Sequence, residues 1–244
     1  PDGTAVSWSR GGSFFERSIE DILTAEGEDT ATVETPIAVT YEVEAPTSVV
    51  ALTGVRVVTM NEARDVLQGA TILIRGNRIA AIGDGDDVAI PDEARVFDLE
   101  GHTVMPGLID AHAHYGSIMS QTNVIEQTQP RLASELAHGV TTLYELYGSS
   151  EKDSWTMDML RSGKSVGPRV FSTGPPIYGL RFFRPNTYRP IESIEEAGEQ
   201  VALNKEAGAT AVKDYVNFKR IERHQLATAA RELGMNVFSE TAGN

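Results

Sequence analysis

The second half of the chain alternates short apolar segments with helical ones, and this alternation constrains the fold more than any other feature. Strands are predicted at five places, namely residues 104–114, 140–146, 168–174, 209–216 and 236–240. Helices are predicted between them, at residues 128–138, 152–163, 191–207 and 221–233. A repeat of about 30–35 residues is typical of the βα units of a parallel barrel. The pattern predicts an α/β fold containing the first five strands of a (β/α)8 TIM-type barrel. An open, doubly wound sheet of five strands is the alternative.

Residues 48–106 carry a different pattern, in which short strands are separated by turn residues. Strand-like segments are predicted at residues 50–52, 55–60, 70–75, 78–83 and 94–99. Gly76-Asn77 is a tight-turn pair that predicts a hairpin between the third and the fourth of these segments. The region is interpreted as a small β-sandwich that directly precedes the first strand of the barrel.

The first 47 residues resemble one hairpin of a β-propeller blade followed by a linker. Pro1-Asp2-Gly3 is a turn signature, and Val6 and Trp8 then alternate with serines as on a half-buried strand. Residues 25–48 are rich in Glu, Thr, Ala and Pro, which is typical of an extended linker. A lone hairpin is at best marginally stable in water, so we expect it to pack on other sequence, including a segment upstream of Pro1. The predicted domains are therefore residues 1–47, 48–106 and 107–244.

Charge and composition exclude several classes of function. The formal net charge is −14, which argues against a nucleic-acid partner because binding phosphates needs a basic surface. No apolar run approaches the roughly 18 residues of a membrane span. The chain has no cysteine, so the ligands of any metal site must be histidine, carboxylate or modified lysine.

Four residues that could carry chemistry lie at the predicted ends of strands. His112 and His114 are two residues apart and therefore point to the same side of one strand. Lys213 lies on the fourth strand and Glu240 ends the fifth, and active sites of parallel barrels gather at these strand ends. A structural histidine pair, an ion-paired lysine and a salt-bridging carboxylate are the alternatives. Glu145, at the end of the second strand, is interpreted as structural or as a support for the ligands.

Several segments together resemble the amidohydrolase superfamily, over about residues 49–243. They are Gly101 to His114, with its proline-glycine entry into a strand ending in His-x-His, and residues 75–83, 139–142 and 168–174. The propeller-like start resembles the subgroup in which a Tol-type β-propeller precedes the amidohydrolase domain. In that case the compartment is periplasmic or secreted, with the cytoplasm as the alternative.

The resemblance implies a hydrolase with one or two divalent metal ions, zinc first and manganese or iron as alternatives. His112 and His114 would bind the more buried ion, and Lys213 would be carboxylated and bridge two metals. Glu240 falls where many members have a histidine, which puts the second metal in question or replaces its ligand by a carboxylate. The family's general-base aspartate would lie beyond residue 244, on barrel strands supplied by a longer precursor or a second chain.

The expected reaction is hydrolysis of amide or peptide-like C–N bonds by a metal-activated water. Cyclic amides and short dipeptides, including those ending in proline, are the expected substrates, and a homo-oligomer is the expected assembly. An esterase, lactonase or organophosphate hydrolase with the same metal site is one alternative. A non-catalytic propeller–barrel scaffold is another. Tyr178, Phe182 and Phe183 are expected either to line a substrate pocket or to pack a loop.

Overall fold

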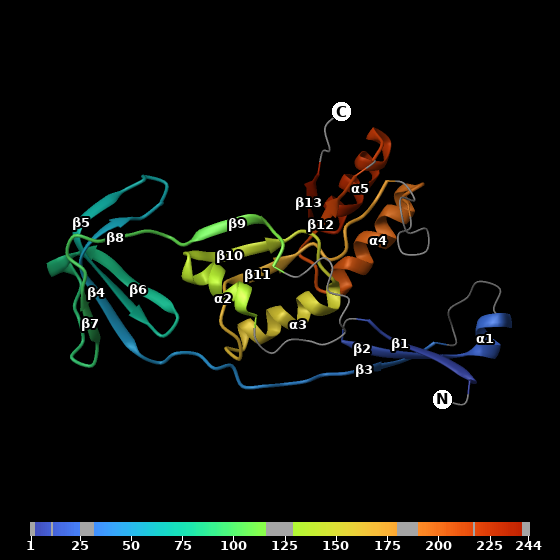
Figure 1. Cartoon of the computed structure of the whole chain (residues 1–244), viewed down its shortest axis with the longest axis horizontal. Coiled ribbons are helices and arrows are strands. Elements are labelled where there is room, and N and C mark those ends of the chain that lie inside the picture. The colour runs from blue at the N-terminus through green and yellow to red at the C-terminus, as the bar shows by residue number, and fades with distance from the viewer. Residues whose placement is uncertain are drawn as a thin grey trace.

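The computed structural model describes residues 3–10, 12–24, 32–115, 129–179, 190–216 and 218–240. Within these residues the chain forms several separate sheets, with helices confined mainly to the second half (Figure 1). No helix among them is long and apolar enough to cross a membrane.

The N-terminal segment forms a small antiparallel sheet. Its elements are β1 (Ala5–Arg10), β2 (Ser13–Ser18), the short helix α1 (Ile19–Thr24) and β3 (Val33–Pro36). The strand order is β1-β2-β3, so the predicted hairpin forms, and part of the expected linker adds a third strand. The rings of Trp8 and Phe15 stack across the hairpin with their centroids 5.6 Å apart. A propeller origin of this sheet stays a prediction.

The segment after β3 runs extended along the molecule and contacts the central part of the chain (Figure 1). The Glu44 amide donates to the carbonyl of Ser162 at 2.8 Å, and the Glu44 carboxylate pairs with Lys164. An added Cβ at Gly163 would lie 2.5 Å from the Glu44 carbonyl oxygen. The close approach of this linker therefore depends on the absence of a side chain at Gly163.

The strands predicted as a β-sandwich are joined in one bent sheet. They are β4 (Val49–Val58), β5 (Val66–Arg75), β6 (Arg78–Asp84), β7 (Arg95–Asp98) and β8 (Thr103–Val104). The order is β6-β5-β4-β7, and β8 pairs with the second half of β4. The segments predicted at 50–52 and 55–60 are one continuous strand. Gly54 has a φ of +72° and the register shifts beside it, so the chain bends there without turning back.

The connection from this sheet to the central strands relies on another close backbone contact. A Cβ at Gly107 would lie 2.2 Å from side-chain atoms of Thr141. Only glycine lets the backbone pass this close to its neighbour. Two segments that the sequence analysis singled out separately, 101–114 and 139–142, are therefore packed against each other.

The described residues of the second half form five parallel strands and four helices of eight to 13 residues. The strands are β9 (Leu108–Ala113), β10 (Val140–Glu145), β11 (Arg169–Ser172), β12 (Ala211–Asp214) and β13 (Asn236–Ser239). The helices are α2 (Pro130–Ala137), α3 (Ser150–Arg161), α4 (Ile194–Glu206) and α5 (Arg220–Glu232). The predicted mixed α/β class is confirmed.

These strands are divided into a sheet of order β11-β10-β9 and a pair β12-β13. Among the described residues, a small number of hydrogen bonds joins the two. The Thr210 amide donates to the carbonyl of Ser172 at 2.9 Å, and Ile177 forms an isolated parallel bridge to Asp214. The five strands thus lie side by side in chain order, from β9 to β13, but β11 and β12 are not continuously paired. Their assignment to the wall of a partial barrel stays a prediction.

The two faces of the parallel strands are packed differently. On one face, Leu143 of β10 is fully buried in a cluster with Leu132 of α2 and Met157 of α3. The next residue, Tyr144, points to the other face, as alternation along a strand requires. Its ring lies 5.3 Å from that of Phe171 and 4.9 Å from that of Phe238. The helices therefore cover one face, and an aromatic layer lines the other.

Candidate functional site

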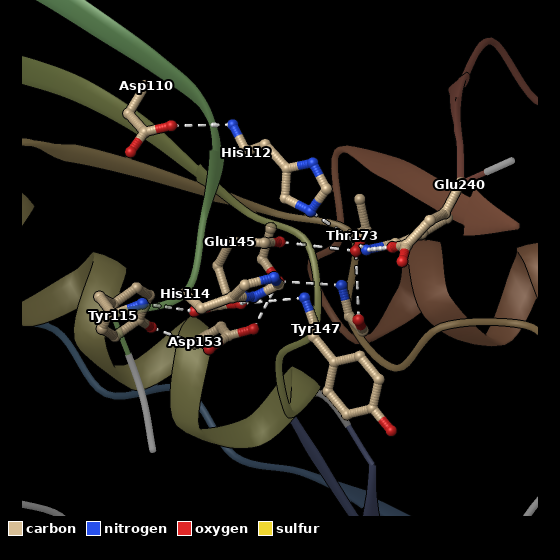
Figure 2. Close-up of polar contacts among 12 residues, drawn as sticks. Asp110, His112, His114, Tyr115, Glu145, Tyr147, Asp153, Thr173 and Glu240 are labelled. Atoms are coloured by element: carbon tan, nitrogen blue, oxygen red, sulfur yellow. Dashed lines mark hydrogen bonds and ion pairs between the residues drawn. The ribbon is translucent and has the colours of Figure 1, made fainter. Parts of the chain in front are cut away.

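Three of the four residues predicted as metal ligands meet at the ends of β9, β12 and β13, and Figure 2 labels two of them, His112 and Glu240. The Lys213 ammonium lies 3.4 Å from His112 Nε2 and 2.5 Å from Glu240 Oε2. β12 and β13 are paired in parallel, so Lys213 and Glu240 reach the same edge, and the junction between the two sheets brings His112 of β9 beside them. His112 and Glu240 are 128 positions apart in the sequence, and the Lys213 ammonium lies between them.

His114, the fourth predicted residue, lies beside His112 but has a different partner. The two imidazole rings are 5.2 Å apart in an edge-to-face arrangement. His114 Nδ1 contacts Glu145 Oε1 at 2.9 Å (Figure 2). The His114 ring, which was predicted to bind a metal, is thus bound through Nδ1 to the carboxylate of Glu145 at the end of β10.

Lys213 is the most buried charged side chain of the cluster, with 1% of its side chain exposed. An isolated ammonium at such a position would be strongly unfavourable, so a charged partner is required. Glu240 supplies it, and the ring of Tyr215 adds a cation–π contact with its centroid 5.1 Å from Nζ. His112 and Glu240 therefore already face a positive charge.

Asp214 fixes the backbone next to Glu240 and was not predicted to act at the site. Its Oδ1 accepts the Glu240 amide at 3.1 Å, and its Oδ2 accepts the Ser239 hydroxyl at 2.8 Å. Arg223 of α5 lies 3.7 Å from the same carboxylate. Burial raises the pKa of Asp214, and the hydrogen bonds and Arg223 oppose that shift. The carboxylate thus ties β12, β13 and α5 together beneath Glu240.

A buried network extends from Glu145 into the helical layer. The Tyr115 hydroxyl donates to Asp153 Oδ1 at 2.8 Å, and the Ser172 hydroxyl donates to the other oxygen of Asp153. Burial raises the pKa of the Tyr115 hydroxyl, which keeps it protonated as a donor. Burial also raises the pKa of Asp153 from 3.8 to about 6. Neither Tyr115 nor Asp153 was predicted from the sequence. The only local signal was that Tyr115 directly follows the histidine pair.

Tyrosines flank the cluster on the side of the loops. The ring of Tyr147 lies 6.4 Å from that of His114 and 5.5 Å from that of Tyr215, and its hydroxyl lies 2.7 Å from the Tyr178 hydroxyl. Beyond them is a pocket of about 460 Å³, lined in part by Tyr147, Tyr178, Pro176 and Leu203. Tyr178 therefore takes part in both loop packing and a pocket. Phe182 and Phe183 lie outside the described residues.

The donor set was tested for its fit to a divalent cation. In the part of the chain that the structure describes, no group of three or more His, Cys, Asp or Glu side chains is arranged as a metal site. The candidate residues instead place an ammonium between an imidazole nitrogen and a carboxylate oxygen. Imidazole and carboxylate are ligands that zinc and manganese accept. The donor types are therefore those of a zinc or manganese site, and in this structure the Lys213 ammonium occupies the position between them.

Comparisons with known proteins agree on one superfamily. No protein-family model matches the chain. The adenine deaminase of a Ruegeria species is 35% identical over 81 residues, which cover 33% of this chain and 12% of that protein. The enamidase of Eubacterium barkeri is 36% identical over 78 residues, covering 32% and 20%. A prolidase candidate from Bifidobacterium longum, known from a crystal structure, is 26% identical in sequence. Its structure superposes with a TM-score of 0.65, and the match covers 80% of this chain and 49% of that chain.

All three proteins are members of the amidohydrolase superfamily. The chain is therefore similar to proteins of the amidohydrolase superfamily. It spans about half of the solved relative (49%) and a fifth or less of the two curated ones. The superfamily implies a divalent metal ion, which agrees with the donor types gathered around Lys213.

Proposed function

We propose that the chain provides the metal-binding part of a hydrolase that cleaves amide or peptide-like C–N bonds. The observation that carries this proposal is the convergence of His112 Nε2 and Glu240 Oε2 on the buried Lys213 Nζ. The likeness to the superfamily supports it, since the similar proteins are named as a deaminase, an enamidase and a prolidase candidate.

Each residue of the cluster has a proposed role. His112 and His114 would hold a divalent ion through imidazole nitrogens, and Glu240 would contribute a carboxylate oxygen. Lys213 would react as the neutral amine with carbon dioxide and release a proton to solvent, and the oxygens of the resulting carbamate would help to hold the ions. A bound ion would supply Lewis acidity, which polarises a carbonyl and acidifies a water molecule. Zinc suits the imidazole–carboxylate set, with manganese or iron as alternatives.

The proposed substrates are cyclic amides and short dipeptides, including those that end in proline. Tyr147 and Tyr215 support this choice because their rings lie beside His114 and Lys213 and offer apolar, amphipathic surface to a compact substrate. The likeness to a prolidase candidate supports the same class.

The complete enzyme would need further groups. A general-base aspartate and the remaining strands of a (β/α)8 barrel are proposed to come from a longer precursor or from a second chain. The N-terminal sheet is proposed to belong to a β-propeller, and the assembly to be a homo-oligomer in the periplasm or outside the cell.

The first test is metal content together with hydrolysis. The protein is purified with whatever chain completes it, its metals are measured, and it is offered dipeptides, cyclic amides, esters, lactones and phosphotriesters. Zinc-dependent cleavage of the C–N substrates is expected, with loss on chelation and recovery on adding zinc or manganese. Cleavage of only the ester, lactone or phosphotriester substrates would replace the proposed reaction.

Variants locate the activity at the proposed site. His112→Ala is expected to abolish both metal retention and hydrolysis. His102→Ala is the matched control, because His102 is exposed directly before β8 and its ring contacts the backbone carbonyl of Glu100. A folded protein that retains no metal would overturn the proposal and favour the scaffold alternative.

A further inference from the structure

Glu145 is a buried carboxylate whose oxygens are surrounded by N–H groups. It ends β10 and is 2% exposed. Its Oε2 accepts the backbone amide of Tyr115 at 2.8 Å, and its Oε1 accepts the backbone amide of Tyr147 at 2.9 Å. Backbone N–H groups can only donate, so both oxygens act as acceptors. His114 Nδ1, at 2.9 Å from Oε1, completes this environment.

The two backbone bonds determine what His114 can do. An ionised carboxylate is acceptor-only, and each oxygen already faces a fixed donor, so His114 Nδ1 must carry a proton to bond to it. A neutral imidazole with its proton on Nδ1 has its lone pair on Nε2. In metal sites the second nitrogen of a ligand histidine is commonly held in this way, which sets both the tautomer and the ring orientation.

We propose that Glu145 is a positioning residue that holds His114 in its Nδ1–H tautomer and turns Nε2 toward the cation site shared with His112. The part that concerns the cation rests on the proposed function. The tautomer itself is a property of the metal-free chain.

The surroundings of Glu145 favour this role over simple packing. Its backbone carbonyl accepts the Thr173 amide at 3.1 Å, which ties the end of β10 to the residue after β11. The bond from Tyr115 OH to Asp153 fixes the residue that follows His114. The ring of Tyr147 lies edge-on to that of His114. Figure 2 shows the His114 ring beside Glu145. The Glu145 side chain is 3% exposed and that of His114 is 31% exposed, so the carboxylate is the more firmly fixed of the two partners.

The first measurement is the tautomer of His114 in the wild-type protein after chelation. Long-range ¹H–¹⁵N spectra of the imidazole distinguish the tautomers, and His114→Ala identifies the signals. At a pH where the ring is neutral, an Nδ1–H tautomer is expected. An Nε2–H tautomer would overturn the proposal. The tautomer itself is measured in the wild-type protein.

The second measurement compares Glu145→Gln with Glu232→Gln. Glu232 is exposed at the end of α5 and serves as the control for loss of one carboxylate. E145Q places an amide NH2 against a backbone N–H or against His114 Nδ1. We therefore expect the tautomer of His114 to change. We also expect the zinc affinity to weaken by about 10- to 100-fold. E145D, which keeps the charge, is expected to restore part of the affinity. E232Q is expected to leave both quantities unchanged.

The outcomes separate the two proposals. An unchanged tautomer and unchanged affinity in folded E145Q would overturn the role of Glu145. If wild-type protein binds no zinc but shows the Nδ1–H tautomer, which E145Q alters, Glu145 positions His114 and the metal function fails.

Discussion

Lys213 Nζ and Glu240 Oε2 form an ion pair of 2.5 Å in which the two partners are unequally buried. The lysine side chain is 1% exposed, whereas that of the glutamate is 33% exposed. Removing Glu240 would leave an ammonium buried beside His112. Removing Lys213 would leave a carboxylate that water can still reach. The two partners should therefore respond differently to substitution.

We expect Glu240→Ala to lower the free energy of unfolding of the chelated protein by about 3–5 kcal/mol, since it leaves a buried charge without its partner. Lys213→Met should be less harmful, because the methionine fills the space and the remaining carboxylate is partly hydrated. The double variant should recover most of the loss from E240A. Urea unfolding of all four proteins measures the cycle. A larger loss in K213M than in E240A would contradict this account.

Asp153 predicts a pH dependence of stability. Its pKa is raised to about 6 in the folded chain from 3.8, so the folded state binds the proton more tightly. The stabilisation is fully present below pH 3.8 and is lost as pH rises through about 6, a difference of about 3 kcal/mol. Asp153→Asn cannot titrate. The free energy of unfolding of wild type minus that of D153N should therefore fall between pH 4 and pH 7. A flat difference would show that Asp153 is ionised throughout.

Substitution by alanine should have opposite effects on stability at Gly148 and at Gly198. A Cβ at Gly148 would lie 1.8 Å from Asp153 Oδ2, so Gly148→Ala must displace the carboxylate that binds Tyr115 and Ser172. A Cβ at Gly198, inside α4, meets nothing within 4 Å. Gly198→Ala should stabilise the protein by about 0.5–1 kcal/mol through helix propensity, whereas G148A should destabilise it. Thermal unfolding of both variants provides the comparison.

Metal binding should appear as a gain in stability even without a substrate. Zinc at 100 times its dissociation constant should raise the free energy of unfolding by about 2.7 kcal/mol. We expect this gain in wild type and in His102→Ala, and its loss in His112→Ala. Calorimetry with and without chelator measures it, and an equal gain in H112A would place the ion elsewhere.

The local pattern of the sequence was sufficient to predict most helices and strands of the second half. The helix predicted at residues 191–207 forms as α4, and at its start the Ser193 hydroxyl accepts the Glu196 amide at 3.2 Å. The strand at 33–36 was missed because its pairing with β2 depends on a partner distant in the chain. The bend at Gly54 was taken for a break, since a glycine in a strand pattern predicts either.

The sequence by itself determined which residues reach the site. His112, Lys213 and Glu240 lie at strand ends because hydrophobic periodicity sets the strands and parallel order brings their ends together. Only the tertiary structure decided what these residues contact. Lys213 pairs with Glu240, and Glu145 holds His114 across 31 positions of sequence. Such pairings depend on strand register and side-chain reach to within an ångström, and neither is encoded in local periodicity.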